Sequence, residues 1–348
     1  MAPAVVFAGV VFGLVLTPAA LAHGDEQLPA PTLASLALGW EFDASVWLPA
    51  IAAVALWLLG VRRVRGRGGR VAAVRTVAWL AGVGVILVAL ESGIGVYDTT
   101  LFSLHMVQHL LLTMAGPPLL LLAGPVTLLL QAAPPAVRRR WILRVLHSRA
   151  LRIVANPVVA GVVFALVIWG THLSPVFEAS LENAGIHDAE HAAFFVSALL
   201  LWWPVMGRDP SPYRLSPAAG ALYLGLQMPQ MAFLSVAMLM APAPLYATYA
   251  SAARTWGPTP LADQQLAAGI MWVGGSLVFI GAVVVLIGLW MRDEDRRAMR
   301  EDRRLDAAEA ALTASVSASP SASPSAPASA SASASSSTAG SPSVASSD

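Results

Sequence analysis

Residues 101–130 read LFSLHMVQHLLLTMAGPPLLLLAGPVTLLL, a stretch without a single Asp, Glu, Lys or Arg. A helix needs about 20 apolar residues to cross the hydrocarbon core of a bilayer, so this stretch is long enough to span one. Backbone amides find no water in lipid, which favours a helix over an irregular chain. Pro117-Pro118 interrupt the stretch and predict a kink, beyond which the second half tilts or re-enters the membrane.

Further apolar blocks lie on both sides of this stretch. The chain is 57% hydrophobic and 12% charged, whereas about a quarter of the residues of a soluble domain are charged. No alternating pattern typical of an outer-membrane barrel is visible. The sequence therefore predicts an all-α polytopic membrane protein with about seven transmembrane helices after an N-terminal signal-like segment. The predicted spans are 44–61, 71–90, 101–130, 151–172, 188–206, 216–240 and 264–290.

The arginines predict how these spans are oriented. The joints 62–70, 138–152, 208–214 and 292–304 hold 19 of the 21 arginines, and lysine is absent. Because basic residues are retained on the cytoplasmic side of a membrane, these four joints are expected in the cytoplasm. We therefore expect a multi-pass protein of the bacterial cytoplasmic (inner) membrane, with its N-terminus outside and its C-terminus in the cytoplasm.

The segments outside the spans differ in composition. Residues 1–22 form an apolar run that ends in Ala20-Leu21-Ala22, which indicates a signal peptide or a signal anchor. Residues 23–43 are expected to be an extracytoplasmic segment, and 44–292 the seven-helix membrane domain. A charged cytoplasmic helix is expected over 293–312. The Ser/Ala/Pro-rich tail 313–348 is expected to be disordered, because it is too poor in apolar residues to offset the entropy of ordering.

The predicted topology places most of the histidines on one side of the membrane. Five of the seven histidines fall at the predicted outer ends of three spans, and two pairs have i,i+4 spacing, which places both imidazoles on one helix face. A single histidine at a helix end ordinarily bonds water or backbone. Five at one depth indicate a site, because ionisable groups are costly in membrane helices. Imidazole suits copper, zinc, iron and nickel. The predicted metal ligands are His105, His109, His172, His187 and His191.

Other side chains could support such a site. Glu190 and Asp188, beside the second pair, and Asp263 are expected as acceptors that fix histidine tautomers. Met238 and Met240 offer thioethers, which suit Cu(I), although methionine also packs irregular cores.

His23 is a further candidate ligand. It becomes the mature terminus if cleavage follows Ala22, and the α-amine and imidazole could then chelate copper together. Otherwise it is an ordinary residue after the cleavage site.

Several classes of function find no support in the sequence. Cysteine is absent, so thiolate metal sites and thiol catalysis are excluded. No P-loop, dinucleotide fingerprint or nucleophile elbow appears. The arginine joints are better explained by topology than by nucleic-acid binding. We therefore expect a protein that is not an enzyme and binds no nucleic acid.

Four motifs resemble those of the bacterial CtaG family of caa3-type cytochrome c oxidase assembly factors. They are HMVQH…GPP within 105–118, THLSPVFE at 171–178, HDAEH at 187–191 and DQQ…MW within 263–272. The similarity covers roughly 40–292. It implies a multi-spanning, non-enzymatic factor for the haem–copper oxidase of the respiratory chain, with copper as the handled metal. The family's motif histidines fall on the five predicted ligands. The implied partners are cytochrome c oxidase subunits, a copper ion or copper chaperone, and membrane lipid.

The residues themselves leave two other functions open. A copper transport or resistance permease would need soft or polar ligands that continue toward the cytoplasm, and Met114, Gln131 and residues 227–231 could form such a path. A b-type haem protein would use histidines from two helices as axial ligands.

Overall fold

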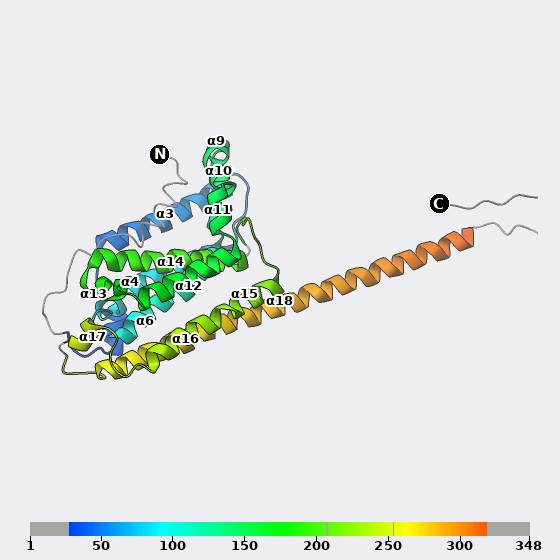
Figure 1. The fold of residues 1–348 in the computed structure, drawn as a ribbon. Coiled ribbons are helices and arrows are strands. Elements are labelled where there is room, and N and C mark those ends of the chain that lie inside the picture. Colours follow the sequence, from blue (N-terminus) through cyan, green and yellow to red (C-terminus); the bar gives the residue numbers. More distant parts are fainter. Residues whose placement is uncertain (1–27, 207, 253, 319–348) are drawn as a thin grey trace, which may run out of the picture. The chain divides into compact units, whose positions relative to one another are not determined.

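The chain is a bundle of helices in the computed structural model, which describes residues 28–206, 208–252 and 254–318 (Figure 1). Within these ranges there is no β-strand. The predicted signal segment 1–22, His23 and the tail beyond Ala318 lie outside the described residues. The helices are α2 Leu33–Leu38, α3 Ala44–Gly66, α4 Ala73–Glu91, α5 Gly93–Val96, α6 Phe102–Leu110, η1 Leu111–Ala115, α7 Gly116–Ala123, α8 Pro125–Ala132, α9 Pro135–Val137, η2 Arg138–Ile142, α10 Leu143–Leu146, α11 Arg149–Val154, α12 Pro157–His172, α13 Pro175–Glu182, α14 Ala184–Met206, α15 Pro217–Gly225, α16 Gln227–Leu239, α17 Ala247–Ser251 and α18 Pro260–Ala318.

Among the residues that the structure describes, six helical segments are long and apolar enough to cross a membrane. A seventh crossing results if α12 and α13, which meet at a bend of 69°, are counted as one broken span. The prediction of an all-α polytopic membrane protein with about seven spans is confirmed. The fourth predicted span differs in detail, because the first residues of 151–172 belong to the separate helix α11 and α12 begins only at Pro157.

The proline pair in the third span is accommodated by a change of helix type. Residues Leu111–Ala115 form one π-helical turn, η1, directly before Pro117 and Pro118. A proline has no amide proton, so neither of them can donate to the carbonyl oxygen of Thr113. The indole Nε1 of Trp202 on α14 donates to that oxygen instead, at 3.1 Å. The whole segment remains one candidate span, Phe102–Ala132.

The span is interrupted a second time at Gly124, where Arg75 and Asp209 form hydrogen bonds with the free backbone groups. Gly124 adopts a positive φ of 70°, and α8 starts afresh at Pro125. Arg75 on α4 donates to the two carbonyl oxygens at the end of α7, at 2.6 and 2.8 Å. Asp209 accepts from the first two free amides of α8, at 3.1 and 2.7 Å. Burial raises the pKa of Asp209, although these amides and the guanidinium favour its charged form.

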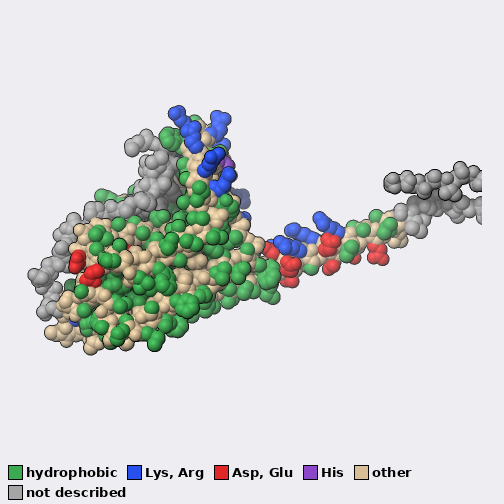
Figure 2. Space-filling view, in the orientation of Figure 1, with side chains coloured by type: hydrophobic (Ala, Val, Ile, Leu, Met, Phe, Trp, Pro, Cys, Tyr) green, Lys and Arg blue, Asp and Glu red, His purple; other side chains and the backbone are tan. Residues whose placement is uncertain are grey.

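The helices of the span-forming unit pack around two apolar clusters. One contains Trp57 and Trp79, whose rings stack at 4.9 Å between α3 and α4. The other contains Phe164, Trp202 and Phe279 from α12, α14 and α18. Figure 2 shows that apolar side chains also cover the visible surface, as expected of a lipid-facing bundle, while Arg side chains gather over α9–α11.

Gly82 allows α4 and α7 to approach each other closely. A Cβ at this position would lie 2.8 Å from the side chain of Leu120 and 3.1 Å from its backbone nitrogen. We expect Gly82→Ala to destabilise the fold by about 1–3 kcal/mol, because the backbone of α7 must move. Gly84→Ala is the matched control, since nothing lies within 4 Å of that position, and it should be neutral or stabilising. Thermal unfolding in detergent measures both, and equal melting temperatures would contradict the prediction.

The described residues after Asp293 belong to a second unit. Its described part is the exposed, charged end of α18, which is helical as far as Ala318. Two exposed ion pairs, Arg297–Glu294 and Arg304–Glu301, connect residues three positions apart at 3.5 and 3.7 Å. Such pairs support an isolated helix by a few tenths of a kcal/mol, at roughly 0.2–0.5 each.

Candidate metal site

Three helices bring the five predicted histidines together. α6 supplies His105 and His109, α14 supplies His187 and His191, and α12 ends at His172. Each i,i+4 pair has its ring centroids 4.2 Å apart. Between helices, the rings of His105 and His187 lie 5.3 Å apart, and those of His109 and His172 lie 6.2 Å apart. Four of the five are buried, and His187 is half-buried.

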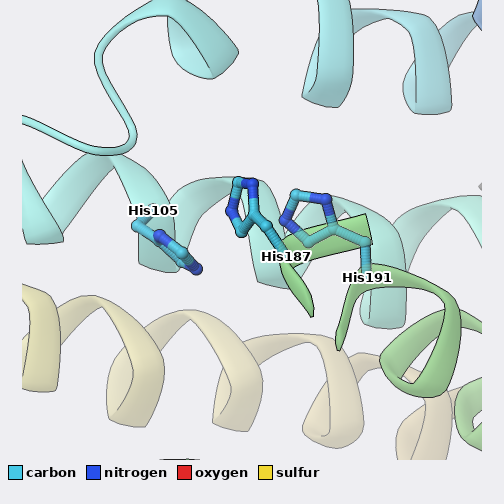
Figure 3. Close-up of side chains that lie close together, drawn as sticks. All are labelled: His105, His187 and His191. Atoms are coloured by element: carbon cyan, nitrogen blue, oxygen red, sulfur yellow. The ribbon is translucent and has the colours of Figure 1, made fainter. Parts of the chain in front are cut away.

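Among the described residues, two groups of three donors that share His105 are close enough to hold a metal ion. In the first, one ring nitrogen each of His105, His187 and His191 lie within 4.8 Å of one another. Figure 3 shows these three rings next to one another, one from α6 and two from α14. The second group consists of His105, His109 and Glu190, again within 4.8 Å. His105 belongs to both groups, so it is the residue on which the whole arrangement depends.

Glu190 is placed among the donors themselves. The sequence suggested that Glu190 accepts a hydrogen bond from a ligand histidine. In the structure its carboxylate lies within 4.8 Å of a ring nitrogen of His105 and of His109. Neither carboxylate oxygen has a hydrogen-bond partner among the described residues. The nearby hydroxyl of Ser180 donates to the carbonyl oxygen of Phe177 at 2.7 Å. A buried carboxylate in this state is costly, and a cation at the same place would remove the cost.

A tyrosine fixes the tautomers on α6. Burial raises the pKa of Tyr249, so its hydroxyl keeps its proton, which it donates to the carbonyl oxygen of Asp98 at 2.7 Å. His105 Nδ1 lies 3.0 Å from the same hydroxyl and must donate to it. A neutral imidazole carries one proton, so His105 Nε2 accepts from His109 Nε2 at 2.8 Å. The result is a free lone pair on His109 Nδ1.

A backbone carbonyl fixes the tautomer of His172. Its Nδ1 lies 2.8 Å from the carbonyl oxygen of Ile168, which can only accept, so Nδ1 carries the proton. Its Nε2 therefore has a lone pair, and within the described part of the chain this nitrogen has no partner. Metal-ligating histidines ordinarily donate their other ring N–H to a carbonyl or carboxylate. His172 matches this pattern, because its Nδ1 donates to a backbone carbonyl and its Nε2 carries the lone pair.

The remaining predicted site residues have different positions. Met238 is buried, but Met240 is 76% exposed. Residues two positions apart point about 200° away from each other on a helix, so both could not face one site. Asp188 is half-buried beside the second pair. Asp263 accepts a hydrogen bond from the backbone amide of Phe102 at 2.8 Å. It therefore caps the start of α6, whereas the sequence suggested that it fixes a histidine tautomer.

The sequence alone did not single out the aromatic residues around the histidines. Phe177 on α13 stacks on His172 at 5.2 Å and lies 5.1 Å from His105. Tyr246 donates to the carbonyl oxygen of His172 at 2.9 Å. The only signal in the sequence is the pair of tyrosines at 246 and 249, three residues apart on the loop before the last span.

A cluster of imidazole and carboxylate donors buried among helices of membrane length defines a polytopic membrane protein with a candidate metal site. The comparisons with known proteins place it more narrowly. The chain belongs to the cytochrome c oxidase caa3 assembly factor family (Caa3_CtaG), which it matches over residues 55–293. The resemblance inferred from the four motifs is thereby confirmed.

The curated relatives are mycobacterial proteins without an assigned function. Uncharacterized proteins of Mycobacterium bovis and Mycobacterium tuberculosis are each 32% identical to the chain over 291 residues. One from Mycobacterium leprae is 29% identical over 294 residues. The alignments cover 82% of this chain but 44–45% of the relatives, so the chain spans about half their length. No solved structure matches the chain.

Proposed function

We propose that this protein assists the assembly of a caa3-type cytochrome c oxidase by binding copper at the histidine cluster, without being an enzyme itself. Membership of the assembly factor family supports the oxidase as the partner. The observation that supports a metal is the group of His105, His187 and His191, whose donor nitrogens lie within 4.8 Å of one another in a buried site. Imidazole donors suit copper, and copper is a metal that a haem–copper oxidase requires.

The arginine pattern supports an outer-face location for the cluster. The arginine-rich joints follow α3 and precede α12, whereas the cluster lies at the start of α6, the end of α12 and the start of α14. If the joints are cytoplasmic, the histidines lie at the outer side of the cytoplasmic membrane. Copper bound there would be delivered to an oxidase centre on the same side, with an oxidase subunit or a copper chaperone as the exchange partner.

The test is the metal content of the oxidase in cells that lack this protein. We expect an oxidase that contains haem but less than stoichiometric copper, restored by the wild-type gene and not by His191→Ala. A His147→Ala gene is the control and should restore it fully, because His147 is an exposed residue that bonds only the carbonyl oxygen of Leu143. An oxidase with its full copper content in the deletion strain would overturn the proposal.

Tyr249 should tune the affinity of this site without binding the metal. Tyr249→Phe removes the hydroxyl that accepts from His105 Nδ1, so the tautomer with the proton on Nδ1 and a lone pair on Nε2 is no longer favoured. Loss of such a partner typically weakens metal binding about 10–100-fold. Copper affinity of the purified protein, measured against a competing chelator, checks this. Tyr213→Phe is the matched control, and equal affinities of the two variants would contradict the prediction.

A further inference from the structure

A small cavity lies beside the histidine cluster, further along α6. Its volume is about 20 Å³, and the residues with donor atoms around it are Met106, His109, His172, Met231 and Met271. They come from α6, α12, α16 and α18. A cavity needs roughly 10–15 Å³ to hold a single water molecule, so this one has room for one small ion. The other lining residues are apolar apart from Thr113.

The two histidines that line this cavity each have a ring nitrogen without a hydrogen-bond partner among the described residues. The tautomers derived above leave His109 Nδ1 and His172 Nε2 as acceptors, and neither receives a hydrogen bond from any residue that the structure describes. Both side chains are at least nine-tenths buried. Buried polar atoms are almost always satisfied, and each exception requires an explanation. A metal ion bound in the cavity would accept these electron pairs and would explain why the two nitrogens have no other partner.

The three methionines make the donor set soft. Met106, Met231 and Met271 are all buried, and each lines the cavity. Thioether sulfur selects Cu(I) over hard cations, whereas carboxylate suits Mg²⁺ and Ca²⁺. The cavity therefore differs from the neighbouring groups of imidazole and carboxylate donors, in which no sulfur takes part. The two predicted thioether ligands, Met238 and Met240, are not among its lining residues.

A glycine on α18 makes room for one of these thioethers. A Cβ at Gly275 would lie 2.7 Å from the terminal methyl of Met231 and 3.5 Å from its sulfur. Any larger residue would push the end of this side chain out of its present position. Gly281, six residues further along the same helix, has open space around it. Gly275 thus leaves the end of the Met231 side chain free to take its present position.

We propose that the cavity is a Cu(I) site, with two to three thioethers of Met106, Met231 and Met271 and the free nitrogens of His109 and His172 as its donors. The inference rests on the proposed function for the identity of the metal. It adds that the protein holds reduced copper at a site of its own, which shares His109 with the group of His105, His109 and Glu190. No change of oxidation state is needed, because copper enters and leaves as Cu(I).

The test uses the full chain purified in detergent and titrated with Cu(I) without oxygen, against a chromophoric Cu(I) chelator. X-ray absorption of the bound copper then reports whether sulfur is a ligand. The variant is Met231→Leu/Met271→Leu, which conserves volume and apolar character. Met238→Leu is the matched control, a buried methionine on the same helix as Met231 that does not line the cavity. A second, milder pair is Gly275→Ala against Gly281→Ala.

We expect sulfur ligation in the wild type and in Met238→Leu, and its loss in the double variant with Cu(I) affinity at least about tenfold weaker. Gly275→Ala should weaken Cu(I) binding, and Gly281→Ala should not. Copper bound through nitrogen and oxygen only, or a double variant equal to the wild type, would overturn this inference and leave the proposed function intact. Failure of the wild-type protein to bind copper in either oxidation state would overturn both.

Discussion

Replacing His105 with alanine is expected to weaken copper binding by the purified protein at least about a hundredfold. His105 is the one residue common to both groups of three donors. Its removal leaves each group with two ligands and also breaks the contacts with His109 and Tyr249 that set the tautomers. Removing even an outer partner of a metal ligand costs about 10–100-fold in affinity, so a ligand shared by two groups should cost more. Titration against a competing chelator measures the loss.

Two further variants turn this expectation into a series. His187 belongs to one donor group only, so His187→Ala should lose less affinity than His105→Ala. His147 belongs to neither group and lies in a different part of the fold, after α10, so His147→Ala should bind as the wild type does. Thermal unfolding of each apo protein separates loss of binding from loss of fold. An equal loss in all three variants, or none in His105→Ala, would refute the assignment.

Replacing Asp263 with alanine is expected to destabilise the fold by about 3–5 kcal/mol, the cost of breaking a buried ion pair. Asp263 is 1% exposed and lies 3.9 Å from the guanidinium of Arg254, which is itself buried. It also accepts from the amides of Phe102 and Ser103 at 2.8 and 3.4 Å. Leu101, at the start of α6, has no side chain that can cap the helix. The loss of Asp263 therefore exposes the start of the helix that carries His105.

The loss of stability caused by Asp263→Ala should depend on the presence of Arg254. Adding Arg254→Ala to Asp263→Ala removes the uncompensated charge, so the double variant should recover a measurable part of the lost stability. Glu301→Ala is the control on the same helix, because its ion pair with Arg304 is exposed and contributes at most about 1 kcal/mol. Denaturant unfolding in detergent compares these variants with Arg254→Ala and with the wild type. Strictly additive effects of the two buried substitutions would show that the pair does not interact.

The sequence predicted the convergence of the histidines because two simple regularities suffice for it. Arginine distribution fixes which ends of the spans lie on one side, and i,i+4 spacing fixes which side chains share a helix face. His105, His109, His187 and His191 obey both. The same logic does not join Met238 and Met240, because residues two apart on a helix point to different faces, and their role as ligands stays a prediction. It also could not distinguish Glu190, whose carboxylate lies within 4.8 Å of nitrogens of His105 and His109, from Asp188 beside it.

What the sequence by itself determined is therefore local. Apolar length determined the helices and the membrane class, and spacing within α6 and within α14 determined the two histidine pairs. Only the tertiary structure decided which helices meet and in what rotation. Tyr249 reaches His105 across 144 residues of chain, and Asp263 reaches Phe102 across 161. Helical periodicity defines the faces of a helix, but the packing of side chains between helices selects the face that each neighbour contacts.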